Sequence, residues 1–364
     1  MRLLHVYTSP SFSGAEAYAV DLARLQRQKH EVTFFAKAKS PLAKQLQSHP
    51  AIKLTTIPPD FSQFDAVILH STQELKTQWL RILATKLKAQ QPKIVVYTHI
   101  WISHPKNDPL HAIIYSLVDA VWCSSQGSKE ALQRMLPISA NKIQVIRYGR
   151  EIEAIKANLL SRADARRALG IPQDALVVGT LSRVDKGKGS LELFEAVTDL
   201  MQTRSDLHLL MIGPPTSSDP KAAALDQDLT SALDKFNVST RKRITKMGRL
   251  EHGTDYLRAF DLFILASYKE NFALTLLEAQ LAGVPCLATQ SGGSPDLVRP
   301  LATGWLFLPG STDSLRQTLL QALADNDHWS RFADQAKAVV ESEFSFDSVL
   351  TSIDRCLHDL RAPS

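Results

Sequence analysis

Short apolar runs and amphipathic segments alternate along the whole of this 364-residue chain, and that alternation limits the folds that it can form. In the first half, a helical pattern covers residues 15–28 and another covers 74–91. The strand candidates around them are Arg2 to Tyr7, Glu31 to Ala36, Ala66 to His70, Ile94 to Tyr97, Ala120 to Cys123 and Ile143 to Ile146. Such alternation predicts a parallel sheet with helices on both faces.

The second half repeats this plan. Its strand candidates are Leu176 to Leu181, Leu207 to Ile212, Ile244 to Met247, Leu262 to Leu265 and Pro285 to Ala288, with helices beginning at Leu191, Ala222, Thr254 and Leu274. A polar stretch between the halves holds a helical pattern at 163–169 and a break at 170–172, which is typical of a linker. We therefore expect an α/β protein with domains at 1–150 and 174–345 and a linker at 151–173, since the chain exceeds the size of one core.

The composition is that of an ordinary soluble protein, with 44% hydrophobic and 22% charged residues. No apolar run reaches the 18 or so residues of a membrane span, and residues 1–7 are too short for a secretory signal. We expect a cytoplasmic protein. Its three cysteines, Cys123, Cys286 and Cys356, share no metal or redox spacing and are expected to be buried free thiols.

The net charge of +5 conceals an asymmetry between the halves. Residues 1–150 hold 19 basic and 9 acidic side chains, whereas residues 151–364 hold 23 and 28. A basic first half suits an anionic partner such as a lipid surface, a phosphorylated acceptor or nucleic acid. A solvated surface rich in lysine explains the charge equally well.

Two glutamates, Glu270 and Glu278, stand with seven residues between them where the strand at 262–265 runs into the helix that begins at Leu274. Glu270 falls in the turn, and Glu278 lies on the helix. At the carboxyl edge of a parallel sheet such a turn borders the usual ligand site, where the helix N-terminus offers N–H groups to an anion. Carboxylates for sugar hydroxyls beside amides for phosphate suit a nucleotide sugar.

The segment also contains Phe272, Ala273 and Leu274 after the first glutamate, Ala279 and Gly283 after the second, and Gly292 with Gly293 beyond. This ordered set resembles the signature of the retaining GT-B glycosyltransferases of glycosyltransferase family four. The resemblance implies two doubly wound Rossmann-like domains facing a central cleft. It also implies that a C-terminal helix, here within 346–364, crosses back onto the first domain.

By this resemblance, the loop GTLSRVDKGKG at 179–189 places Arg183 and Lys188 where the family holds the diphosphate. Lys186 competes with Lys188 for that role, although the glycine after Lys188 fits the pattern better. Cations there would meet the charge that grows on the leaving diphosphate. Glu270 is implied to contact the donor sugar, Glu278 the ribose hydroxyls, and the amides from Phe272 to Leu274 the sugar and phosphate.

The first half supplies two further positions that match the family. His99, in YTHI, is implied to orient the donor sugar and to stabilise positive charge near its anomeric carbon; His70, which ends AVILH, is a weaker candidate on the acceptor side. The segment SFSGAE carries Ser13 and Gly14 where the family has two glycines. The serine puts in doubt the close backbone approach that a glycine allows at residue 13.

The resemblance implies a retaining reaction on the front face of the sugar, with the leaving phosphate taking the acceptor's proton. We expect no cofactor and no required metal. Asp226 and Asp228 form the Asp-x-Asp string that metal-dependent enzymes use, but they lie in a polar helical run and are expected to be solvated. The expected partners are a UDP- or GDP-linked sugar and a glycan or lipid-linked acceptor of lipopolysaccharide or exopolysaccharide assembly.

Two other functions are weighed against this one. A nucleotide-sugar epimerase on the same fold would lack the context of phenylalanine, small residue and leucine that follows Glu270. A basic nucleic-acid-binding protein would need aromatic side chains interleaved with lysine and arginine, whereas the aromatics here fall mostly in apolar runs. We therefore expect no nucleic acid partner.

The helix expected over 74–91 carries Leu75, Trp79, Ile82, Leu83 and Leu87 on one face, with Lys76, Arg81, Lys86 and Lys88 beside it. This pattern is typical both of a helix packed on a sheet and of one lying on an anionic bilayer. Packing is the commoner outcome. Peripheral contact with the inner face of the cytoplasmic membrane stays open as the alternative.

Overall fold

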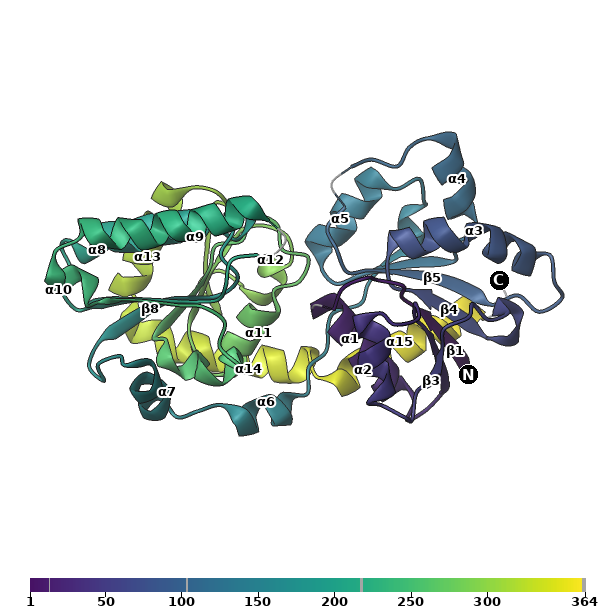
Figure 1. Cartoon of the computed structure of the whole chain (residues 1–364), viewed down its shortest axis with the longest axis horizontal. Helices are drawn as coiled ribbons and strands as arrows, with labels where there is room; N and C mark the ends of the chain where they lie inside the picture. The colour runs from purple at the N-terminus through teal and green to yellow at the C-terminus, as the bar shows by residue number, and fades with distance from the viewer. Residues whose placement is uncertain (13, 103, 217–218, 362–364) are drawn as a thin grey trace. The chain divides into compact units, whose positions relative to one another are not determined.

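The computed structural model describes residues 1–12, 14–102, 104–216 and 219–361, so Ser13 lies outside the described residues. The chain forms two compact units (Figure 1). The first comprises Met1–Gly149 and Phe346–Ser364, and the second comprises Arg150–Ser345. The segment 151–173 is therefore grouped with the second unit, where Arg166 is fully buried and bonds Asp261 at 2.6 Å.

The first unit is built on a sheet of seven parallel strands in the order β3-β2-β1-β4-β5-β6-β7. These are β1 (Arg2–Val6), β2 (Glu31–Phe35), β3 (Lys53–Thr55), β4 (Ala66–Leu69), β5 (Lys93–Thr98), β6 (Ala120–Cys123) and β7 (Ile143–Val145). Six of them were predicted to within about a residue at each end. The short β3 was not, because three residues carry no readable alternation.

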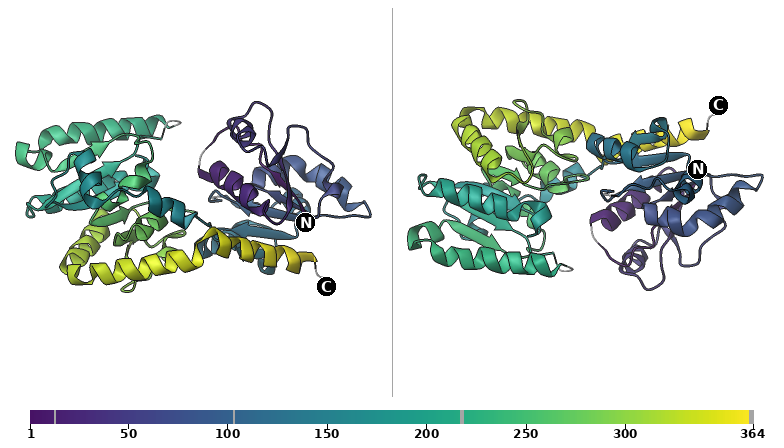
Figure 2. Two further views of the ribbon diagram at one scale, coloured as in Figure 1. Left: turned by 90° about the horizontal axis from the view of Figure 1, so that it is seen from below. Right: turned by 90° about the horizontal axis from the view of Figure 1, so that it is seen from above.

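Helices cover both faces of this sheet. They are α1 (Gly14–Gln26), α2 (Pro41–Gln47), η1 (Phe61–Gln63), α3 (Thr72–Lys86), α4 (Pro109–Ser116), α5 (Gln126–Met135), η2 (Ala140–Lys142) and α15 (Phe346–Arg361). Leucine, isoleucine and tyrosine side chains of α3, α4 and α5 pack with alternate residues of β1, β4 and β5, such as Leu4 and Val96. Helices α1 and α15 contact each other near the opposite face, and both ends of the chain lie in this unit (Figure 2).

Helix α3 packs on the sheet, as the commoner reading of its sequence predicted, but its apolar face differs from the prediction. Leu75 and Ile82 are buried, whereas Leu83 is 38% and Leu87 is 83% exposed. The helix ends at Lys86, so Leu87 falls in the C-cap and leaves the buried stripe. The Lys86 ammonium lies 3.0 Å from the carboxylate of Asp119.

The second unit has a sheet of six parallel strands in the order β10-β9-β8-β11-β12-β13. These are β8 (Leu176–Leu181), β9 (Leu207–Ile212), β10 (Ile244–Met247), β11 (Leu262–Leu265), β12 (Cys286–Thr289) and β13 (Gly304–Phe307). Five were predicted, with β12 shifted by one residue. Strand β13 was missed because its four residues directly follow a turn and show no clear alternation.

The helical elements of this unit are α6 (Ile152–Asn158), α7 (Arg162–Leu169), η3 (Lys186–Lys188), α8 (Ser190–Met201), α9 (Pro220–Ala232), η4 (Leu233–Lys235), α10 (Val238–Arg241), η5 (Gly253–Ala259), α11 (Leu274–Leu281), α12 (Ser294–Leu297), α13 (Thr312–Ala324), η6 (Asn326–His328) and α14 (Trp329–Glu343). Apolar side chains of α8, α9 and α13 share one core with the strands. Helix α11 contacts η5 and α14 (Figure 1). Cys123 and Cys286 are buried free thiols as predicted, and Cys356 is half-buried.

Candidate functional site

Three loops meet at the carboxyl edge of the second sheet: the loop after β8, the loop after β11 and the loop after β12. Backbone hydrogen bonds tie them together, from Tyr268 N–H to the carbonyl of Gly187 and from Gly293 N–H to the carbonyl of Glu270, both 2.8 Å. Gly292 has a φ of 58°, and a Cβ there would lie 2.0 Å from the Glu270 carbonyl oxygen. A glycine is therefore required for this contact.

These loops bring two of the predicted residues into contact. The Lys188 ammonium lies 2.6 Å from a carboxylate oxygen of Glu270, and both side chains are about one-fifth exposed. The Asp185 carboxylate holds the turn by accepting a bond from the Lys188 backbone N–H at 2.9 Å. Gly189 follows in the left-handed region, where a Cβ would lie 2.2 Å from the Ala266 carbonyl oxygen. The backbone of these loops therefore positions Lys188 and Glu270 for their ion pair.

Arg183 and Lys186 are both exposed. Arg183 stands in the loop between β8 and η3, whereas Lys186 begins η3. The structure therefore separates the two lysines that competed in the sequence, because Lys188 is the one paired with Glu270.

Glu278 lies on α11, with a side chain that is only 5% exposed. Its carboxylate is paired with the guanidinium of Arg150. Burial raises the pKa of Glu278, and the Arg150 charge opposes that rise. Arg150 was not singled out from the sequence, since no local pattern connects two residues so far apart along the chain.

The Phe272 side chain lies in the interior of the second unit. It is 5% exposed and packs against Phe344, with ring centroids 5.7 Å apart. Ala273 is buried and directly precedes α11, and it provides no side-chain cap. Leu274 begins that helix. The N-cap residue of α11 thus supplies no side-chain cap, and first-turn N–H groups of a helix favour an anion.

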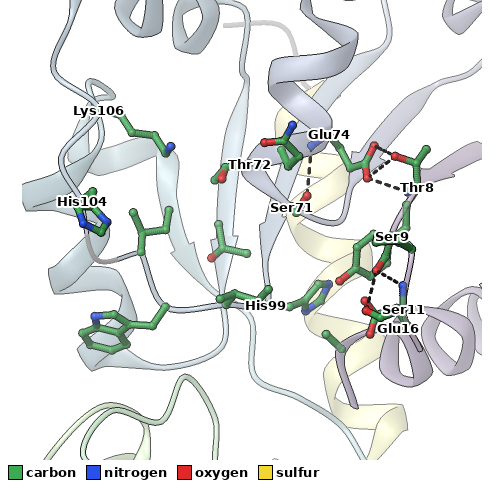
Figure 3. Close-up of a pocket in the computed structure, with 18 residues that line it drawn as sticks. Thr8, Ser9, Ser11, Glu16, Ser71, Thr72, Glu74, His99, His104 and Lys106 are labelled. Carbon is green, nitrogen blue, oxygen red and sulfur yellow. Dashed lines mark hydrogen bonds between the residues drawn. The ribbon is translucent and has the colours of Figure 1, made fainter. Parts of the chain in front are cut away.

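The first unit contains a pocket of about 500 Å³ at the carboxyl edge of its own sheet. Figure 3 shows Thr8, Ser9, Ser11 and Glu16 on one side of it, with Lys106 and His104 across from them. Apolar side chains of Ile100, Trp101 and Ile102 also line it, together with the Glu74 carboxylate. The pocket thus offers hydroxyls, carboxylates and a cation beside an apolar surface. Gly14 begins α1, and a Cβ there would meet no atom within 4 Å.

His99 lines this pocket and is 8% exposed. Burial lowers its pKa to about 3, although the nearby Glu16 carboxylate opposes the shift. Its Nδ1 is hydrogen-bonded to the Tyr148 hydroxyl, and its Nε2 lies 2.8 Å from Nδ1 of His70. His70 is fully buried and is not part of the pocket lining.

Two carboxylates of the pocket were not singled out from the sequence. Glu16 is 3% exposed, and Glu74 is 2% exposed. Glu74 accepts hydrogen bonds from the backbone N–H and the hydroxyl of Thr8, at 2.7 and 2.9 Å, while burial raises its pKa. Both stand within the first turn of a helix that follows a strand, which is a signal that sequence reasoning could have used.

Within the described part of the chain, no group of three or more histidine, cysteine or acidic side chains is placed to hold a metal ion. Asp226 lies on α9 and pairs with Lys246 at 2.7 Å. None of the helices among the described residues is long and apolar enough to cross a bilayer.

Two family models match the chain. "Glycosyl transferases group 1" covers residues 161–339, and "Glycosyltransferase Family 4" covers residues 12–154.

Curated relatives agree with these models. A D-inositol 3-phosphate glycosyltransferase of Streptomyces avermitilis is 27% identical over 243 residues, which is 66% of this chain and 51% of the relative. A lipopolysaccharide 1,2-N-acetylglucosaminetransferase of Salmonella typhimurium is 30% identical over 228 residues, which is 62% of this chain and 58% of the relative. The chain thus spans about half the length of the curated relatives that it matches.

Solved structures match over the whole chain. A glycosyltransferase from Rickettsia africae has a TM-score of 0.84 at 20% identity and covers 100% of this chain and 99% of that one. HepE of Anabaena, in complex with UDP-glucose, has a TM-score of 0.78 at 20% identity and covers 99% and 100%. At this identity the likeness shows a shared fold, with two Rossmann-like domains.

Proposed function

Since those two family models match residues 12–154 and 161–339, the chain belongs to the glycosyltransferases of group 1 and family 4, and we propose that it transfers a hexose or related sugar from a nucleoside diphosphate sugar to a glycan or glycolipid acceptor. One observation carries the donor side of this proposal. Lys188, Glu270 and Glu278 are held by tied loops and α11 at the carboxyl edge of one sheet.

On the donor side, binding of the donor would replace the ion pair between Lys188 and Glu270 with contacts from each residue to the donor. Lys188 is neutralised by Glu270 before a donor binds. A diphosphate would draw the ammonium away, and Glu270 would then accept hydrogen bonds from sugar hydroxyls. Arg183 adds a second cation, and Glu278 binds the ribose. Because these cations and the α11 amides meet charge as it grows on the leaving group, they lower the barrier rather than only bind.

We propose a UDP- or GDP-linked donor, retention of anomeric configuration and no required metal. Anabaena HepE, which shares the fold, was solved with UDP-glucose, and this supports a nucleotide sugar as the donor. Retention follows the family signature. The cationic side chains and amides described above supply the charge stabilisation that a metal provides in other transferases.

The acceptor is assigned to the pocket of the first unit. Glu16 and the hydroxyls of Ser9 and Ser11 are groups that bind sugar hydroxyls, and Lys106 can meet an anionic group on the acceptor. The Salmonella relative is named for lipopolysaccharide. We propose an acceptor of lipopolysaccharide or another surface polysaccharide.

The test is a screen of UDP-, GDP- and ADP-sugars by thermal stabilisation, followed by analysis of the product. A ligand at a hundred times its dissociation constant should add about 2.7 kcal/mol to the free energy of unfolding. The Arg183→Ala variant should lose most of this gain, and the anomeric configuration of the product should match that of the donor. Stabilisation by none of these donors would contradict the proposal. Conversion of the donor to its epimer without an acceptor would establish the epimerase alternative.

We also propose that the first unit binds the surface of an anionic membrane through α3 and α4. These helices contact each other, and they expose Leu80, Leu83 and Leu87 on α3 and its cap, and Leu110 and Ile113 on α4. Two of the cations expected to assist, Lys86 and Lys88, are already paired with Asp119 and Asp60. The contact therefore depends more on the exposed leucines than the sequence suggested.

Vesicle co-sedimentation tests this surface. Replacing Leu80 and Leu87 by Gln should weaken binding to vesicles that contain phosphatidylglycerol, because each leucine loses its apolar contact with the acyl region. Hydrolysis of the free donor should be kept. Equal sedimentation of variant and wild type would show that these leucines do not contribute to membrane binding.

A further inference from the structure

Three histidines lie side by side across the first sheet. His5 is on β1, His70 directly follows β4 and His99 directly follows β5, and these strands are neighbours. The rings stack with centroids 5.1 Å apart from His5 to His70 and from His70 to His99. The histidines therefore form a continuous row that starts inside the unit and ends at the pocket.

A chain of hydrogen bonds runs along this row. His5 Nδ1 lies 2.8 Å from His70 Nε2, and His70 Nδ1 lies 2.8 Å from His99 Nε2. His99 Nδ1 meets the hydroxyl of Tyr148, whose ring stacks on Tyr18 with centroids 4.0 Å apart. His5 and His70 are 0% exposed, and Tyr148 is 5% exposed. Of the four residues, only His99 lines the pocket.

Such a chain couples the tautomers of its members. A neutral imidazole has one N–H donor and one bare nitrogen, so each contact between two rings needs a hydrogen from one side only. Once one ring is fixed, its neighbour must follow. Phenol is the stronger acid and imidazole the stronger base, so the Tyr148 hydroxyl donates to His99 Nδ1. The proton of each histidine then lies on Nε2, and His70 donates to His5.

The inner end of the chain is closed. His5 Nε2 and the Oε1 and Nε2 atoms of Gln26 are buried and form no hydrogen bond of standard geometry with any of the described residues. Gln26 is 2% exposed and interacts with His5. Because the row ends at this buried amide, it is suited to hold protons in place rather than to carry them to solvent.

We propose that His5, His70 and Tyr148 are positioning residues that fix the ring and the tautomer of His99 at the pocket wall. The proposal rests on the transferase function above, in which positive charge develops at the anomeric carbon of the donor. A neutral, fixed imidazole does not oppose that charge, and a ring held on both nitrogens cannot rotate out of place. Displacement of a group by about 1 Å can cost a hundredfold in rate.

The first experiment needs no substrate. In 15N-histidine protein, NMR should show two couplings between ring nitrogens across N–H···N hydrogen bonds, and all three rings should carry the proton on Nε2. The His70→Phe variant should lose both couplings. Absence of both couplings from the wild type would refute the proposed hydrogen bonds between the three histidines. This result would hold whatever the enzyme's substrate proves to be.

The second experiment measures kcat and KM with the donor found in the screen. The His5→Phe and Tyr148→Phe variants keep an aromatic ring but remove a hydrogen-bonding group, and each should lower kcat by about tenfold or more with KM little changed. The His5→Gln variant keeps an acceptor for His70 Nε2–H and should restore most of the rate.

Phe34→Leu is the matched control. Phe34 stacks on His5 and His70, with centroids 5.7 and 6.0 Å away, but it forms no part of the chain. This variant should keep the wild-type kcat. An equal loss of kcat in Phe34→Leu and His5→Phe, or an unchanged kcat in His5→Phe, would refute the positioning role. The three histidines would then contribute only to packing in the core. Failure to turn over any donor would instead refute the transferase proposal and leave the NMR result standing.

Discussion

Acidification should destabilise the first unit more strongly than the second. Burial lowers the pKa of His5 and His99 to about 3, and that of His70 well below its ordinary value of 6.5. In the unfolded chain these histidines would titrate normally. Between their folded and unfolded pKa values the unfolded state binds more protons, so stability rises with pH and is lost as pH falls below about 6.5.

The size of the effect follows from this difference. At pH 5.5 the ratio of charged to neutral histidine in the unfolded chain is about ten to one. This protonation stabilises the unfolded state by about 1.4 kcal/mol for each histidine. Three such groups give about 4 kcal/mol between pH 7.5 and 5.5, a large part of the 5–15 kcal/mol of a typical domain. The second unit has His208, whose pKa burial lowers to about 4, and should lose about a third as much.

Hydrogen exchange with peptide resolution measures the two units separately, after correction for the intrinsic effect of pH on exchange. The free energy of opening should fall by about 4 kcal/mol in peptides of β1, β4 and β5 and by about 1.4 kcal/mol in those of β9. The His5→Phe variant should lose about a third of the slope in the first unit. Equal losses in the two units, or no loss between pH 7.5 and 5.5, would refute the assignment of neutral buried histidines.

Three further predictions concern the donor side. Lys188→Ala should lower turnover by about a hundredfold, whereas Lys186→Ala, in the same turn, should not; steady-state kinetics with both variants decides. Glu278→Gln should raise KM about tenfold at constant kcat, because a ribose contact is equal in ground and transition states, and isothermal titration with the free nucleoside diphosphate should show the same loss. Gly292→Ala should displace the Glu270 loop and cost about 1–3 kcal/mol in chemical unfolding, and unaltered stability would contradict the close contact.

The sequence predicted the architecture well because its signals are local. Parallel strands buried on both faces appear as continuous apolar runs, and five of six in the second unit and six of seven in the first were located this way. What it could not predict was where a helix stops facing the core. Leu83 and Leu87 follow the correct helical spacing, but the end of α3 at Lys86 places Leu87 beyond the buried stripe.

The candidate site likewise contains residues that the sequence could predict and contacts that it could not. Glu270, Glu278, Arg183 and Lys188 could be proposed from their order in the chain, since they fall in the loops after β8 and β11 or on the helix that follows β11. Lys188 and Glu270, which were both proposed for the donor site, are in contact in the structure. The pairing of Glu278 with Arg150 and the chain from His5 to Tyr148 could not be proposed, because they join residues that only the folded sheet brings together.

Helix α15 affects the order in which the two units of this protein can finish folding. The second unit is a single uninterrupted stretch of chain, whereas the first needs residues 346–361, which the ribosome makes after the whole of the second. Phe346 of that helix stacks on Tyr18 with centroids 6.2 Å apart, and its buried face includes Val349, Leu350 and Ile353. During translation the second unit can therefore be complete while the first unit still exposes an apolar surface, and it is the first unit that a chaperone would have to protect.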